Sequence, residues 1–208
     1  MSGIDTLFVI AVVIFSAVIH EVMHGVAADR LGDPTARYAG RLTLNPIPHL
    51  DLWGSIIIPV TLAVSGSPIF FGYAKPVPYN PYNLRPGRFS EAIVAAAGPF
   101  SNLAIAGVIA IVIRSGRVPT IALEFLFLTV LVNVMLFLFN LIPIPPLDGS
   151  KVLESILSGS LKRGYASWRD RMDQSPLAGM LLVVLIIYLL AGAFGSFVYS
   201  VARVLVGA

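Results

Sequence analysis

The stretch LFVIAVVIFSAVIHEVMH, residues 7–24, places two histidines and a glutamate at the end of an almost wholly apolar run. Residues four positions apart on a helix share a face, so His20 and His24 can point the same way. Two imidazoles at this spacing can bind one zinc ion, and the adjacent Glu21 can act as general base toward water that the metal activates. Polar and charged side chains are costly in lipid, and a metal ion would compensate for that cost.

The composition excludes several classes of protein. The chain has 208 residues, of which 57% are hydrophobic and 12% are charged, and its mean hydropathy is +0.86. Since soluble domains carry about 25% charged residues, these values predict a polytopic membrane protein. The net charge of +3 is too small to suggest a nucleic-acid partner. The chain has no cysteine, which excludes disulfides and thiolate metal sites.

The apolar stretches predict the fold class. They cover residues 7–28, 52–64, 91–113, 120–142 and 176–206. We expect an all-α polytopic membrane protein with about four to six transmembrane helices, since a helix needs about 20 residues to cross the hydrocarbon. The short second stretch contains Pro59 and is at least as consistent with a re-entrant segment as with a full crossing. The last stretch could form one tilted helix or, as the less favoured alternative, a two-helix hairpin.

The polar connections complete this expectation. We expect short β-strands in the membrane-proximal loops, for example at residues 39–44. The chain reads as one domain, residues 1–208, with a core at 7–150 and a C-terminal helical region at 151–208. Lysines and arginines gather in residues 30–51, 71–88 and 151–171, which places these segments on the cytoplasmic side.

This topology predicts where a third metal ligand would lie. The helix at 7–28 and the helix at 120–142 both run inward, so residues that follow 142 should lie near His20 and His24. Asp148 comes directly after a proline-rich turn at that place. It could instead only cap a following helix. His49 and Asp51 are rival ligands, although a role in a surface loop is favoured for both.

Together the two motifs resemble the site-2 protease family of intramembrane zinc metalloproteases, in its compact branch without PDZ or CBS domains. The resemblance rests on HEVMH at 20–24, GDPTA at 32–36, GRLTLNP at 40–46, FGYAKPVP at 71–78, AGPFSN at 97–102 and LDG at 147–149.

The resemblance implies a role for each matching residue. It implies that His20, His24 and Asp148 bind a single zinc ion and that Glu21 is the catalytic base. It implies that Asn102 and Asn140 are catalytic, either positioning substrate or stabilising the oxyanion. For Asn102, an interhelical hydrogen bond is an equally weighted alternative.

The expected function is that of a zinc-dependent intramembrane endopeptidase. The resemblance implies single-span membrane substrates, such as anti-sigma factors or transcription regulators. The lipid bilayer is the other expected partner, and no nucleic-acid partner is expected. We expect a multi-pass protein of a prokaryotic plasma membrane with its active site toward the cytoplasm. The alternative from another class is a membrane zinc-binding or transport protein. An inactive scaffold is a third possibility, which the intact Glu21 disfavours.

Overall fold

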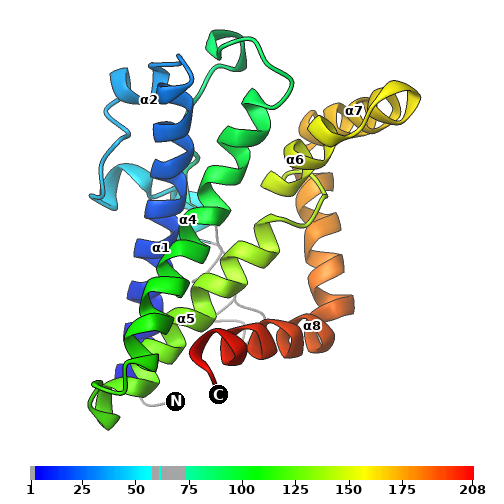
Figure 1. The fold of residues 1–208 in the computed structure, drawn as a ribbon. Coiled ribbons are helices and arrows are strands. Elements are labelled where there is room, and N and C mark those ends of the chain that lie inside the picture. Colours follow the sequence, from blue (N-terminus) through cyan, green and yellow to red (C-terminus); the bar gives the residue numbers. More distant parts are fainter. Residues whose placement is uncertain (1–2, 58–60, 62–73) are drawn as a thin grey trace.

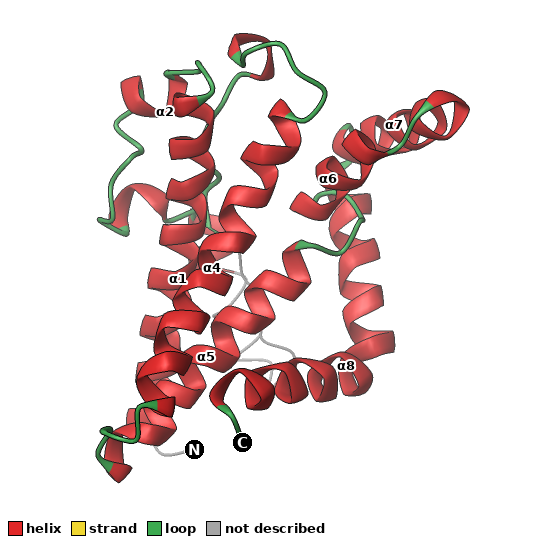
Figure 2. Cartoon of the chain, in the orientation of Figure 1, coloured by secondary structure: helices red, strands yellow, loops and turns green. Residues whose placement is uncertain are grey.

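The computed structural model describes residues 3–57, 61 and 74–208, and this part of the chain is helical (Figure 2). The α-helices are α1 (Gly3–Arg30), α2 (Thr35–Tyr38), α4 (Ser90–Arg114), α5 (Thr120–Asn140), α6 (Asp148–Ile156), α7 (Gly159–Asp173) and α8 (Pro176–Val206). Short 3-10 helices lie at Ile47–His49 and Pro81–Asn83, and a π-helical segment lies at Leu52–Ile57.

Within the described residues, three helices are long and apolar enough to cross a membrane, and they coincide with the predicted apolar stretches 7–28, 91–113 and 120–142. They are Thr6–Arg30 within α1, Ser90–Arg114 and Thr120–Asn140, with mean hydropathies of 2.3, 2.0 and 2.5. α1 and α5 run in one direction and α4 runs between them in the other (Figure 1). The late part of α1 and the end of α5 therefore lie toward the same end of the molecule. Of the predicted re-entrant segment at 52–64, residues 58–60 and 62–64 lie outside the described residues, and 52–57 form the π-helical segment.

Small side chains allow the helices to pack closely. Ala106 and Ala110 of α4 lie in one buried cluster with Val130 and Val134 of α5 and with Ala202 of α8. Small residues let helix backbones approach closely, which strengthens the dispersion contacts between them. Such contacts matter in lipid, because the hydrophobic effect does not favour helix–helix over helix–lipid contact there. α8 is one continuous helical segment that turns sharply along its length (Figure 1), so the last apolar stretch forms neither a straight helix nor a two-helix hairpin.

The predicted short strands are wrong for the described residues. The segment 39–44 forms a turn and then irregular chain, with Gly40 at φ +65° closing the turn after α2. The Arg41 guanidinium donates hydrogen bonds to the carbonyls of Lys75 and Pro76, where a ladder would use the backbone N–H. The neighbouring segment cannot complete a ladder, because Pro76 and Pro78 have no N–H.

A buried carboxylate fastens the loops at this end of the molecule. Asp33 is fully buried, and it accepts hydrogen bonds from the Thr35 backbone and hydroxyl, the Asn80 N–H and the Asn83 amide. Burial would raise the pKa of Asp33, but these donors hold it below its ordinary value. The carboxylate therefore ties the loop after α1 to the chain that leads into α4.

Candidate metal centre and active site

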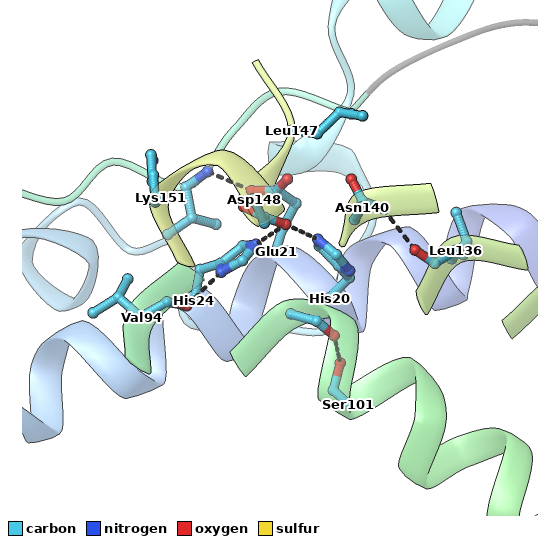
Figure 3. Close-up of polar contacts among 12 residues, drawn as sticks. His20, Glu21, His24, Val94, Ser101, Leu136, Asn140, Leu147, Asp148 and Lys151 are labelled. Carbon is cyan, nitrogen blue, oxygen red and sulfur yellow. Dashed lines mark hydrogen bonds and ion pairs between the residues drawn. The ribbon is translucent and has the colours of Figure 1, made fainter. Parts of the chain in front are cut away.

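His20, His24 and Asp148 meet at one point between α1 and α6 (Figure 3). The two histidines lie one turn apart on the buried side of α1, with 6% and 8% of their surfaces exposed. Asp148 Oδ2 lies 3.1 Å from His20 Nε2 and 3.3 Å from His24 Nε2. One carboxylate oxygen and two ring nitrogens are thus brought together, although Asp148 lies 128 residues after His20 in the chain.

These separations fit the ligands of a divalent metal ion. Metal–ligand bonds of 2.0–2.1 Å in a tetrahedral site place neighbouring ligand atoms about 3.4 Å apart. Burial would raise the pKa of Asp148, but the imidazoles of His20 and His24, which donate from Nε2 when they are charged, hold it well below its usual range. The carboxylate is therefore ionised at neutral pH, as a metal ligand must be.

The other nitrogen of each ring supports the same conclusion. His20 Nδ1 lies 2.7 Å from Asn102 Oδ1, and His24 Nδ1 lies 2.7 Å from the Val94 carbonyl. Both partners can only accept, so each Nδ1 carries a proton and each neutral ring has a lone pair on Nε2. Without a cation, the contacts to Asp148 would need two charged imidazoles beside one carboxylate. A metal ion in that place removes this cost.

The orientation of Asn102 follows from its hydrogen bonds. Asn102 is fully buried, and its amide nitrogen donates to the Ser16 carbonyl and to Asn133 Oδ1. Asn133 in turn donates to the Thr129 carbonyl. Backbone carbonyls accept only, so both amides are fixed and Asn102 must present its oxygen to His20. The family resemblance implied a catalytic role for Asn102 but did not show that it contacts a histidine.

Glu21 lies beside the histidines but has a different partner. Ligand atoms of His20, Glu21 and His24 lie within 4.8 Å of one another. Glu21 Oε2 accepts a hydrogen bond of 2.8 Å from the Val77 N–H, whereas Asp148 contacts both imidazoles directly. The two carboxylates thus differ in their contacts, because Asp148 meets both imidazoles and Glu21 meets a backbone N–H.

Contacts at both ends of α6 hold Asp148 beside the two histidines. A Cβ on Gly149 would lie 2.2 Å from the Leu141 carbonyl oxygen, so only glycine lets α6 start against the end of α5. At the other end of α6, Arg88 donates hydrogen bonds of 3.0 Å to the Ser155 carbonyl and 2.8 Å to the Ile156 carbonyl. A cation at a helix C-terminus also interacts favourably with the helix dipole.

α4 approaches the two histidines at a glycine. A Cβ on Gly98 would lie 2.5 Å from His24 Nε2 and 2.6 Å from His20 Nε2. The next residue, Pro99, cannot donate to the carbonyl of Ala95, which lines the same cavity. The Gly-Pro pair within a helix was visible in the sequence, but its nearness to the histidines was not.

Replacing Gly98 with Ala should therefore displace the imidazoles and lower zinc affinity by at least about 10-fold, the scale seen when the support of a ligand is lost. Gly107→Ala on the same helix is the matched control, because a Cβ there meets nothing within 4 Å. Zinc per chain and a chelator competition titration measure the effect. Equal zinc affinity in both variants would show that α4 does not limit this site.

The remaining predicted residues are placed differently. Asn140 lines the cavity, and its amide nitrogen donates to the Leu136 carbonyl of its own helix (Figure 3). His49 is buried, with Nε2 2.9 Å from the Thr43 carbonyl, and Asp51 accepts hydrogen bonds from two backbone N–H groups. Neither rival ligand is among the residues that line the cavity of His20 and His24.

The site opens into a cavity of about 190 Å³. Its lining combines polar and apolar groups: His20, Glu21, His24, Pro76, Val77, Tyr79, Val94, Ala95, Asn140, Pro146, Asp148 and Lys151. These residues come from α1, the chain before α4, α4 itself, the end of α5, the turn that follows it and α6. The cavity has room for several water molecules or a short piece of extended chain.

Comparisons with known proteins agree with this chemistry. The family model described as Peptidase family M50 matches residues 111–184. The chain is 32% identical over 196 residues to "Putative zinc metalloprotease YwhC" of Bacillus subtilis, covering 90% of this chain and 83% of that protein. The chain belongs to peptidase family M50. The similarity of this M50 peptidase to that relative extends over most of both chains.

Two further relatives are both named "Putative zinc metalloprotease Rip2". One, from Mycolicibacterium smegmatis, is 32% identical over 77% of this chain and 61% of its own length. The other, from Mycobacterium tuberculosis, is 30% identical over 93% of this chain and 70% of its own length. No solved structure matches the chain. The M50 peptidase described here is a zinc metalloprotease of the membrane, as its resemblance to site-2 proteases indicated.

Proposed function

We propose that this M50 peptidase hydrolyses peptide bonds in or next to the transmembrane segments of membrane-anchored proteins. One observation carries the proposal: Glu21 and both histidines face a common cavity in a chain whose three long helices can span a membrane. A water-containing protease site at this position could act on chain that is embedded in lipid.

In this proposal His20, His24 and Asp148 hold one zinc ion. Bound zinc would polarise the scissile carbonyl and promote loss of a proton from water. Glu21 accepts that proton and passes it to the leaving amine. The Val77 N–H fixes the Glu21 carboxylate by a 2.8 Å hydrogen bond, so the base is oriented before substrate binds.

The two asparagines have different roles in this scheme. Asn102 has no free donor for an oxyanion, because both of its N–H groups have acceptors and its oxygen meets His20. We assign it the task of orienting His20. Asn140 lines the cavity and so stays a candidate for contact with substrate or oxyanion.

The alternative of zinc transport lacks a pathway of ligands. The chain has three histidines, and the acids of its three long helices other than Glu21 lie near helix ends, at Asp5, Asp29, Glu91 and Glu124. A relay across the membrane would need such groups at intervals.

The placement in the cell is part of the proposal. Basic residues in the segments 30–51, 71–88 and 151–171 favour the cytoplasmic side for the end of the molecule that carries the site. We propose a multi-pass protein of a prokaryotic plasma membrane, with about four to six crossings if α8 and residues 52–64 contribute. Single-span regulators such as anti-sigma or transcription factors are the proposed substrates.

Purified protein in liposomes tests this function. We expect cleavage of a single-span substrate at a bond inside or beside its span, with the bond mapped by mass spectrometry. Cleavage should stop on chelation and return with zinc. Zinc-dependent cleavage of soluble peptides alone would contradict the intramembrane assignment. Zinc uptake into the liposomes without cleavage would support the transport alternative.

A further inference from the structure

The cavity contains a lysine that the proposed mechanism does not use. Lys151 lies three residues after Asp148 on α6, so both side chains project from the same face of that helix. Figure 3 shows the two residues on one turn, beside the histidines. Lys151 and Tyr79 both line the cavity of about 190 Å³.

Tyr79 holds the lysine in place. Lys151 Nζ donates a 2.9 Å hydrogen bond to the Tyr79 hydroxyl and lies 4.9 Å from the centre of the tyrosine ring. The Tyr79 hydroxyl donates in turn to Glu91 Oε1 at 3.4 Å. These two hydrogen bonds fix the position of the ammonium group, and they leave the Tyr79 hydroxyl with no proton to donate to another group.

The ammonium group has unused donors. It carries three protons, and in the described part of the chain its one hydrogen-bond acceptor is Tyr79. Its distance to every described carboxylate exceeds the 4.0 Å of an ion pair. Burial would lower the pKa of Lys151, but Tyr79, Asp148 and Glu91 raise it, so the group is charged at neutral pH. A partly buried cation with spare donors is suited to bind an acceptor.

The substrate of an intramembrane protease supplies such acceptors. A transmembrane helix satisfies its carbonyls internally, and it must unwind before a peptide bond can reach the catalytic groups. Unwinding frees backbone carbonyls in apolar surroundings, where an unpaired polar group is costly. A donor inside the cavity would offset that cost for the carbonyls nearest the cleaved bond.

We propose that Lys151, held by Tyr79, donates hydrogen bonds to a backbone carbonyl of the unwound substrate beside the scissile bond. This inference rests on the proposed proteolytic function and extends it to substrate binding. Tyr79 is a positioning residue, because its hydroxyl already accepts a hydrogen bond from Lys151 and donates one to Glu91. Since backbone carbonyls are present in every sequence, the contact favours unwound chain rather than particular side chains.

Lys151→Met tests the proposal, because methionine keeps most of the length of the unbranched side chain and removes the donors. We expect kcat/KM for a single-span substrate to fall about 10- to 100-fold, the scale of a lost charged hydrogen bond. Zinc content and melting temperature should match the wild type. Lys151→Arg should recover part of the activity. Lys162→Met on α7 is the matched control and should cleave normally.

A binding measurement separates this inference from proteolysis itself. In the Glu21→Gln background, which does not cleave, Lys151→Met should raise the Kd for fluorescently labelled substrate by about 10-fold or more. Tyr79→Phe should raise it less, because the ammonium remains. A wild type that does not cleave would overturn the proposed function, whereas unchanged Kd and kcat/KM in Lys151→Met would overturn only this inference.

Two further outcomes would also overturn it. Loss of zinc from Lys151→Met would show that the lysine serves to position Asp148. The second outcome concerns the chemical group that Lys151 binds, and it requires two forms of the substrate, with and without acidic residues around the cleaved bond. Equal losses on both forms are expected for a carbonyl partner. A loss confined to the acidic form would show that Lys151 binds a carboxylate instead.

Discussion

Glu21→Gln should abolish cleavage of a single-span substrate while the protein keeps its zinc. Glutamine has nearly the same shape, and its amide oxygen can still accept the hydrogen bond from the Val77 N–H. It cannot take up a proton from water, so the general-base contribution of about 10²–10⁴-fold is lost. The ligand atoms of His20, His24 and Asp148 are untouched by this change.

The measurement pairs turnover in liposomes with zinc per chain. Glu124→Gln is the matched control, because Glu124 is exposed near the start of α5 and far in sequence from the site. The control should cleave at the wild-type rate. Cleavage by purified Glu21→Gln would mean that another group acts as base. Loss of zinc from this variant would mean that Glu21 is itself a ligand.

Asp148→Asn should release the zinc. Asn keeps the size of the side chain, but it replaces the charged oxygen that lies 3.1 Å and 3.3 Å from the two imidazole nitrogens by a neutral amide. We expect zinc affinity to fall by more than about 100-fold, because loss of a ligand exceeds the 10–100-fold effect of losing a supporting group. Cleavage should fall with zinc occupancy, and excess zinc should restore part of it.

Asp51→Asn is the control that decides between the rival acids. Asp51 accepts hydrogen bonds from the backbone N–H groups of Trp53 and Gly54, which an asparagine oxygen can also do. This variant should fold and retain zinc. Zinc loss from Asp51→Asn together with retention in Asp148→Asn would move the metal centre to the loop of His49 and Asp51.

Much of the site could be predicted because its requirements are local. A spacing of four residues puts His20 and His24 on one face of any helix, whatever surrounds it. The nearness of Asp148 followed from helix direction, since helices that run the same way end on the same side. The predicted strand at 39–44 was wrong, because nothing in that segment shows that Pro76 and Pro78 will be its neighbours.

The contacts around the ligands could not be predicted in this way. The bond from Val77 to Glu21 spans 56 residues and depends on the path of a loop. The contact between Lys151 and Tyr79 spans 72 residues and joins that loop to α6. No local pattern encodes such pairings.

The amino-acid sequence alone determined the class of protein, the positions of its long apolar helices and the residues that are candidates to bind a metal. Apolar length and ligand spacing are properties of neighbouring residues, so they survive in any packing. The tertiary structure alone decided which helix faces meet, as where Gly98 approaches the histidines and Asn102 reaches His20. In lipid, buried and lipid-facing surfaces are both apolar, so the residue pattern says little about how each helix is rotated.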